Sequence, residues 1–188
     1  MRPSNRDRIL DAAVRVIQRE GVTAVTFDSV AAEAELTRGG IMYHFPSREG
    51  LLVAIHQHLA DSWEASLLAE AGRPVDELTA DERLSAYIRV NARSATRAEL
   101  QLMLESATHP EWAAPWNGVL ERWAPVPTDV GTDAASMARL VTRLAADGLW
   151  MFEALAYRDL PETQRRAVAE HLVRAVGAPD LSRDPEQG

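Results

Sequence analysis

The stretch that most constrains the fold of this chain runs from Thr26 to Leu52 and reads TFDSVAAEAELTRGGIMYHFPSREGLL. Within it, apolar residues recur three and four positions apart on each side of a short turn. Thr26 and Thr37 stand directly before these two patterns, where a hydroxyl group caps the first turn of a helix. Pro46 ends the second pattern, and Ser47 is placed to cap the next helix. The stretch therefore predicts two short helices, a stop and the start of a third helix.

The rest of the chain also reads as helical, because apolar residues recur at helical spacing and strand-like alternation is missing from the sequence. A first helix is expected over about residues 5–20 and is ended by Gly21. The helix that Ser47 caps is expected to continue to about residue 70. Later helices are predicted at about residues 79–95, 97–108, 115–124, 132–157 and 161–176. The predicted fold class is all-α.

Composition excludes several kinds of site. The 188 residues include no cysteine, so a disulfide, a thiolate nucleophile and a cysteine-ligated metal are all excluded. His56 and His58 lie two positions apart and so point to different sides of a helix, which disfavours a shared metal. We expect neither a cofactor nor an enzymatic activity. No apolar run reaches the roughly 18 residues of a membrane span, so a cytoplasmic protein with no membrane partner is expected.

The charge is distributed unevenly. Residues 1–60 carry seven Arg and seven Asp or Glu, whereas residues 61–188 carry 13 Arg and 21 Asp or Glu. The whole net charge of −8 thus comes from the later part of the chain. An acidic chain of this kind is not an indiscriminate binder of polyanions, but its neutral N-terminal part leaves specific nucleic-acid binding open.

The helix predicted after Thr37 has an unusual outer face. If Ile41 points inward, a step of about 100° per residue turns Gly39 and Tyr43 outward. Gly40 and Met42 then lie on the flanks. Glycines would let the backbone approach base edges, while a thioether and a phenol reach a thymine methyl group and a phosphate. The alternative is that the glycine pair only marks a loop, since each glycine costs a helix interior about 1 kcal/mol relative to alanine.

Donor side chains stand at the predicted helix ends around this face. Hydroxyl, guanidinium and imidazole groups at such positions meet phosphate oxygens together with free backbone N–H groups. They belong to Thr26, Thr37, His44 and Arg48.

These motifs resemble the DNA-binding domain of the TetR family of bacterial transcriptional repressors, over about the first 60 residues. The strongest match is the run TRGGIMYHFPSRE. The resemblance implies a sequence-specific DNA-binding regulator with this DNA-facing set: Thr26, Thr37, Arg38, Gly39, Gly40, Met42, Tyr43, His44 and Arg48. Glu35 departs from the pattern, because family members usually carry glycine at this turn. Either the turn is built differently here, or a left-handed residue costing roughly 1–2 kcal/mol is tolerated.

The resemblance also implies a division into domains. A three-helix helix-turn-helix domain is expected over residues 1–50, with the bridging helix reaching about 70, and a helical ligand-sensing and dimerisation domain over 75–178. Residues 179–188 are expected to form a flexible tail. The implied function is a repressor that an unknown small-molecule effector releases from its operator. The alternative is a helical interaction or nucleoid-associated protein that uses the same domain for a protein partner.

Two late helices carry broad apolar faces. They either fill a core within one chain or pair with a second copy, as the resemblance and a palindromic double-stranded operator both favour. The residues of this predicted homodimer interface are Leu140, Leu144, Phe152, Leu155, Val168, Leu172 and Val176.

The effector pocket is the least defined expectation. Its candidates are Asn91, Met103, His109, Trp112, Trp116, Asp147, Trp150 and Met151, and the tryptophans among them fit a core equally well. Pro115 interrupts the spacing of Trp112 and Trp116, which weakens the argument that they share a face. Asp147 lies in an apolar helix and needs a partner, either an arginine such as Arg89 or Arg93 or a polar ligand.

Overall fold

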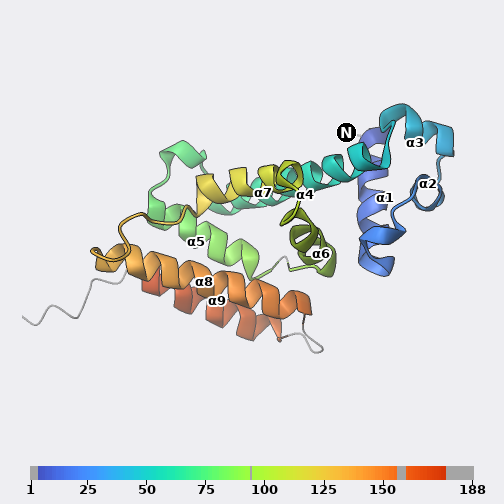
Figure 1. Cartoon of the computed structure of the whole chain (residues 1–188). Coiled ribbons are helices and arrows are strands. Elements are labelled where there is room, and N and C mark those ends of the chain that lie inside the picture. Colours follow the sequence, from blue (N-terminus) through green and yellow to red (C-terminus); the bar gives the residue numbers. More distant parts are fainter. Residues whose placement is uncertain (1–3, 94, 156–159, 177–188) are drawn as a thin grey trace, which may run out of the picture. The chain divides into compact units, whose positions relative to one another are not determined.

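The computed structural model describes residues 4–93, 95–155 and 160–176, and these residues form helices and no strand (Figure 1). They pack as two compact units. The first contains the described residues up to Glu64 together with Thr96–Gly118, and the second contains Ala65–Ala95 and the described residues from Val119 onward. The all-α prediction is confirmed, with a helix-turn-helix at the N-terminal end.

Four helices open the chain. They are α1 (Asn5–Glu20), α2 (Phe27–Ala34), α3 (Arg38–His44) and α4 (Arg48–Ala71), with a single 3₁₀ turn over Val22–Ala24. Their bounds agree with the sequence prediction.

Side-chain caps explain where these helices begin. Ser4 caps α1, and Thr26 caps α2, each in a reciprocal pair with the residue three positions later. The hydroxyl oxygens of Thr37 and Ser47 accept hydrogen bonds from the backbone N–H groups of residues 40 and 50, at 3.1 and 3.0 Å. Each cap satisfies a backbone donor that the helix itself leaves unpaired.

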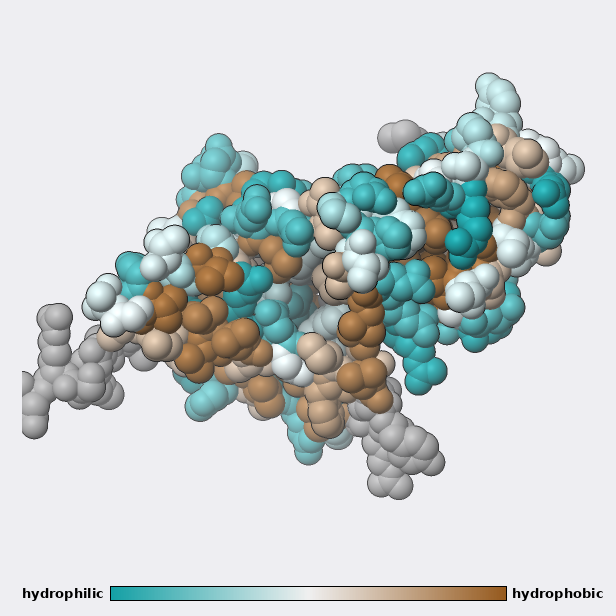
Figure 2. All heavy atoms as spheres, viewed as in Figure 1, coloured by the Kyte–Doolittle hydropathy of each residue, from teal (hydrophilic) through white to brown (hydrophobic). Residues whose placement is uncertain are grey.

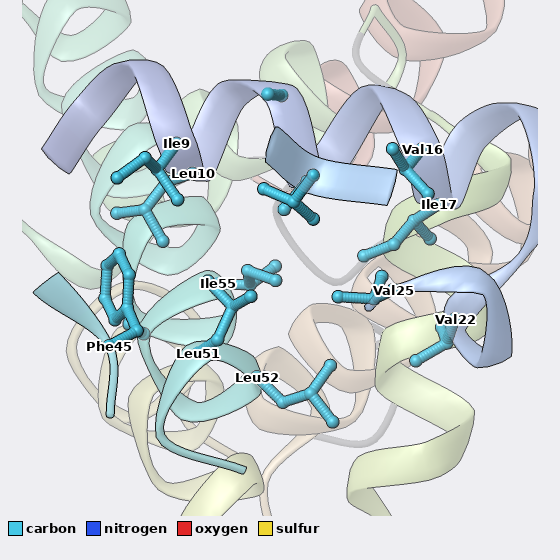
Figure 3. Packing of buried hydrophobic residues seen from close by; sticks show 14 of the residues in the cluster. Ile9, Leu10, Val16, Ile17, Val22, Val25, Phe45, Leu51, Leu52 and Ile55 are labelled. Atoms are coloured by element: carbon cyan, nitrogen blue, oxygen red, sulfur yellow. The ribbon is translucent and has the colours of Figure 1, made fainter. Parts of the chain in front are cut away.

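The core of the first unit lies between α1, α2 and the start of α4 (Figure 3). Ile9, Leu10, Val16 and Ile17 of α1 have no solvent exposure. Figure 3 shows them facing apolar side chains from the 3₁₀ turn, the end of α3 and the first turns of α4. Burying the apolar stripe of α1 is therefore what fixes α2 and α3.

Helix α6 (Arg97–Ser106) and the first part of α7 (Pro110–Trp123) belong to the same unit. The backbone N–H of Ala98 donates to the side chain of Gln18 on α1 over 2.9 Å, and Leu102 lies in the shared core. Helix α7 begins five residues before the predicted start at residue 115, so Pro115 lies inside it.

The second unit is built on α5 (Ala80–Asn91), α8 (Ala134–Leu155) and α9 (Glu162–Val176), which pack against one another. A single 3₁₀ turn over Val75–Glu77 precedes α5. Ion pairs tie these helices together, including Arg139 with Asp81 at 2.7 Å. The predicted end of the helix over 132–157 and the predicted tail over 179–188 lie outside the described residues.

Candidate DNA-reading helix and regulatory residues

The turn between α2 and α3 has a left-handed residue at Glu35, with φ 54° and ψ 45°. Glutamate takes this conformation only against steric strain, so the second of the two possibilities raised by the sequence is correct. The turn is held by a hydrogen bond of 2.9 Å from the N–H of Leu36 to the carbonyl of Ala31. The guanidinium of Arg8 also donates to the carbonyl of Ala34 over 3.0 Å. These bonds keep the tight turn in place despite the strain.

Helix α3 has one buried side and one exposed side. Ile41 is fully buried, whereas the side chain of Tyr43 is 84% exposed and that of Met42 is 42% exposed. Gly39 lies within the helix, and a methyl group added there would meet no atom within 4 Å. The fold therefore does not require glycine at position 39. A methyl group on Gly40 would lie 3.3 Å from the hydroxyl oxygen of the Thr37 cap, so that glycine has a structural reason.

The donors at the helix ends differ in how free they are. Thr26 and Thr37 are exposed caps, so their hydroxyl groups border the surface at the starts of α2 and α3. The exposed Arg38 forms an ion pair of 2.8 Å with Asp28, which solvent screens strongly. His44 is half-buried in the last turn of α3, with its ring edge-on to that of Tyr43 at 5.2 Å. All four lie on or beside the exposed side of the helix-turn-helix.

Arg48 has a structural role that the sequence did not reveal. Its guanidinium donates to the carbonyls of Val25 and Val22, over 2.8 and 3.2 Å. The first residue of α4 thus holds the segment that leads into α2. Carbonyl partners carry no sequence signature, so only the fold could identify this contact.

Comparisons with known proteins agree with this geometry. The family described as bacterial regulatory proteins, tetR family, matches residues 9–55. A C-terminal domain described as tetracyclin repressor-like matches residues 81–177, more than half of the chain. The chain belongs to the TetR family. It is a helix-turn-helix DNA-binding transcriptional regulator and not an enzyme, so both predictions are confirmed.

Relatives match this TetR-family chain along most of its length. The transcriptional regulator BetI of Burkholderia ambifaria is 29% identical over 175 residues, covering 83% of this chain and 85% of its own length. Two solved structures share the fold. A regulator from Saccharomonospora viridis in complex with choline is 22% identical, with a TM-score of 0.69 and coverage of 90% and 95% of the two chains. The multidrug binding protein EbrR complexed with ethidium is 22% identical, with a TM-score of 0.55 and coverage of 92% and 99%.

The residues predicted for the effector pocket of this TetR-family regulator are divided between the two units. Met103, His109, Trp112 and Trp116 belong to the first unit, and Asn91, Asp147, Trp150 and Met151 belong to the second. Asn91 is buried, Met103 and Trp150 are half-buried, and Met151 is exposed. Within either unit the structure therefore brings together only half of the predicted set.

An aromatic cluster forms around His56 of α4 in the first unit. The indole N–H of Trp116 donates to Nδ1 of His56 over 2.9 Å, and the ring of Trp112 stacks on the imidazole at 5.5 Å. His109 stacks on Trp112 at 3.9 Å. Both tryptophans are buried and contact the same histidine, so they share a face although Pro115 interrupts their spacing. Because α7 begins at Pro110, the proline lies inside a helix that keeps the two residues on one side.

His56 is the member of this cluster that the sequence did not single out. It has no solvent exposure, and burial lowers its pKa to about 4, with a smaller effect from His109. The ring is therefore neutral at pH 7, and its proton lies on Nε2 because Nδ1 accepts from Trp116. Nε2 of His56 and the indole N–H of Trp112 are buried donors that lack an acceptor among the described residues.

Asp147 is paired within the protein, but not with the predicted arginines. The hydroxyl of Tyr87 donates to its carboxylate, and the guanidinium of Arg143, one turn earlier on α8, lies 3.7 Å away. Burial, followed by the Asp147 charge, raises the pKa of Tyr87 above its usual range. Arg89 pairs instead with Glu170 at 2.9 Å, and Arg93 with Glu70 at 2.5 Å. Glu170 lies on α9, which packs against α5, and Glu70 lies near the end of α4.

The predicted dimer residues are mostly exposed. On α8, Leu144, Phe152 and Leu155 are 52–65% exposed, and Leu140 is half-buried. The exposed apolar stripe of α8 also includes Met137, Val141 and Met151, and Figure 2 shows hydrophobic surface over this helix. On α9, Val168 is exposed and Leu172 is half-buried, whereas Val176 is buried within its own unit.

Two kinds of feature are missing from the described residues. None of their helices is long and apolar enough to cross a membrane. They also contain no group of three or more His, Asp or Glu residues placed to hold a metal ion.

Proposed function

We propose that this regulator binds a palindromic operator as a homodimer and represses transcription. The observation that carries the proposal is the two-sided character of α3, where Ile41 is fully buried and Tyr43 is 84% exposed. Because α3 packs against the core on one side and is exposed on the other, it presents Gly39, Met42 and Tyr43 to the major groove as one rigid face. Thr26, Thr37, Arg38 and His44 then contact phosphates at the groove edges.

The homodimer is supported by the exposed apolar stripe on α8. Six large apolar residues of α8 are 44–65% exposed, which is unusual for the surface of a monomer. Pairing this stripe with that of a second copy would give a two-fold axis. A two-fold dimer presents its reading helices about 34–36 Å apart, as successive major grooves require.

The functional division of the chain follows from this arrangement. We assign DNA reading to residues 1–50 and sensing and dimerisation to residues 75–178, in a cytoplasmic protein. Helix α4 is continuous from Arg48 to Ala71. A shift of its later turns would therefore reach Arg48, and through it the carbonyls that precede α2. Release from DNA requires the effector to bind the released state more tightly than the DNA-bound state.

The effector class that we propose is an organic cation that also carries a hydrogen-bond acceptor. Similar proteins bind choline and ethidium, as described above. In this chain, Trp112 stacks on both His56 and His109, Trp116 lies at right angles to His56, and aromatic faces attract cations. The unpaired donors on His56 and Trp112 supply two N–H groups for an acceptor oxygen.

The operator proposal is tested with DNA from upstream of the regulator's own gene. Fluorescence anisotropy should show binding that survives excess competitor DNA, and Tyr43→Ala should weaken it about tenfold or more. Tyr43→Phe, which keeps the ring, should lose only the phosphate contact. Log affinity should fall with log salt by about 0.9 per phosphate neutralised. Equal affinity for scrambled DNA would favour the nucleoid-associated or partner-binding alternative.

Transcription in vitro from the same promoter separates repression from activation. Adding choline, a cation that carries an acceptor oxygen, to the complex then tests the effector class, with a Trp112→Leu variant as the comparison. Release of DNA by the cation from the wild-type protein, and its loss in the variant, is the expected result. Release that is equal in both proteins would place the effector elsewhere.

A further inference from the structure

A charged cavity lies in the second unit, apart from the aromatic cluster and the reading helix. Its volume is about 520 Å³, and it lies among the end of α4, the end of α5 and the first half of α9. Its charged lining includes Glu70, Arg89, Arg93, Arg165, Arg166 and Glu170. The volume falls within the range of metabolite pockets, which is roughly 300–1,000 Å³.

Two of the three lining carboxylates are already held by arginines. Glu170 accepts two hydrogen bonds from Arg89, at 2.9 and 3.3 Å, and Glu70 accepts one of 2.5 Å from Arg93. The bond from Arg89 holds the pKa of Glu170 below its usual value, and the same pair raises the pKa of Arg89. Glu70 and Glu170 are therefore not free to form a site for a cation.

The arginines, in contrast, carry more N–H donors than the hydrogen bonds that they form with the described residues. Each guanidinium carries five N–H groups, so the four lining arginines supply about twenty. Among the described residues Arg165 donates one hydrogen bond, of 3.2 Å to Glu153, and its Nε is buried without an acceptor. Arg166 forms no ion pair with any described residue. A buried N–H without a partner costs about 1–3 kcal/mol, which an incoming acceptor would relieve.

We propose that this cavity binds a small oxyanion, a carboxylate or phosphate compound with several acceptor oxygens. The guanidinium groups of Arg165 and Arg166 on α9 would hold it from one side. The remaining N–H groups of Arg89 on α5 and of Arg93, just after α5, would hold it from the other. Planar guanidinium groups match the two oxygens of such anions by paired hydrogen bonds. The ligand would join α5 to α9.

The acidic neighbours decide how selective the site is. Glu153 and Glu162 offset part of the arginine charge, so the lining is close to neutral overall. Attraction by net charge is therefore weak, and binding depends on the geometry of the hydrogen bonds. Chloride has no pair of oxygens to match a guanidinium fork, so it should bind more weakly than a carboxylate or phosphate compound.

The proposal is tested on the DNA-free protein, so its outcome does not depend on operator binding. Isothermal titration calorimetry with inorganic phosphate and with citrate, each against sodium chloride of equal ionic strength, should show saturable binding of at least one oxyanion. A preference for citrate identifies a carboxylate site, and a preference for phosphate identifies a phosphate site. Binding of neither, or an equal heat from chloride, overturns the proposal.

Variants locate the binding. Arg166→Gln should weaken the preferred anion about tenfold. Arg165→Lys should do so as well, because lysine keeps the charge beside Glu153 but lacks the Nε–H of the fork. Arg97→Gln removes an exposed arginine of the first unit and should leave the affinity within about twofold. An equal loss in Arg166→Gln and Arg97→Gln, with no loss in Arg165→Lys, would show binding by net charge and overturn the site.

Discussion

Helices α1 and α8 carry the same kind of sequence pattern and use it differently. Both have apolar residues on one side at helical spacing. In α1 these residues are buried, and Ile9, Leu10 and Ile17 have no exposure at all. In α8 an apolar stripe that includes Leu144 and Leu155 stays 44–65% exposed. An amphipathic pattern therefore predicts a helix, but not whether its apolar side packs inside the chain or against a partner.

The largest expected effect tests the buried side of this comparison. Ile17→Ala removes a fully buried side chain from the core of the first unit. It should lower the free energy of unfolding by about 2–5 kcal/mol, since the lost contacts leave a cavity. Urea denaturation measures this change. Leu144→Ala, at an exposed position, should change the free energy of unfolding by less than about 0.5 kcal/mol when the oligomeric state is unchanged.

The exposed side is tested by placing charges on α8. Leu144→Glu combined with Phe152→Glu should raise the dimer dissociation constant about hundredfold, or 2.7 kcal/mol, because it buries unpaired charge at the proposed interface. Analytical ultracentrifugation measures the constant, and circular dichroism checks the fold. The control is Leu104→Glu with Val126→Glu, two exposed apolar positions outside α8. A dimer that survives the α8 variant would exclude this stripe as the interface.

A polar group inside the buried region should make the stability of the protein depend on pH. Burial depresses the pKa of His56 to about 4 from an ordinary 6.5, so the unfolded chain takes up the proton first as the pH falls. Stability is thus complete above pH 6.5 and declines between about 6.5 and 4, by on the order of 3 kcal/mol. His56→Gln should flatten this part of the curve, whereas His171→Gln, at an exposed position, should not. Matching curves for His56→Gln and the wild-type protein would contradict the assignment.

The smallest expected effect concerns the exposed side of α3. Gly39→Ala should raise the free energy of unfolding by up to about 1 kcal/mol, because a methyl group meets no atom there and alanine favours the helix. The same change should weaken operator binding, because the added methyl group holds the backbone away from the bases. Denaturation and anisotropy measure the two effects. A gain in stability without a loss of affinity would remove Gly39 from the contact surface.

Local features of the helices could be predicted from the sequence, whereas contacts between distant segments could not. The caps at Thr26 and Thr37, the stop at Pro46 and the buried Ile41 depend on neighbours a few positions away, so local spacing was enough. The partners of Arg48 and His56 lie far away in the chain, and so does Tyr87, one partner of Asp147. Arg143, the other partner of Asp147, is one turn away, but distant arginines were equally possible partners. Asp147 shows the limit of prediction from sequence. Its need for a partner could be predicted, but the choice of Tyr87 over Arg89 could not.

The sequence by itself determined the helices, their caps and the two-sided character of α3, because these depend on hydrogen bonds and apolar spacing within a few turns. The tertiary structure alone decided which apolar sides are covered, that Arg48 holds backbone carbonyls, and that four arginines line one cavity. The physical reason is that burial and pairing depend on distances between segments far apart in the chain, which helical periodicity does not encode.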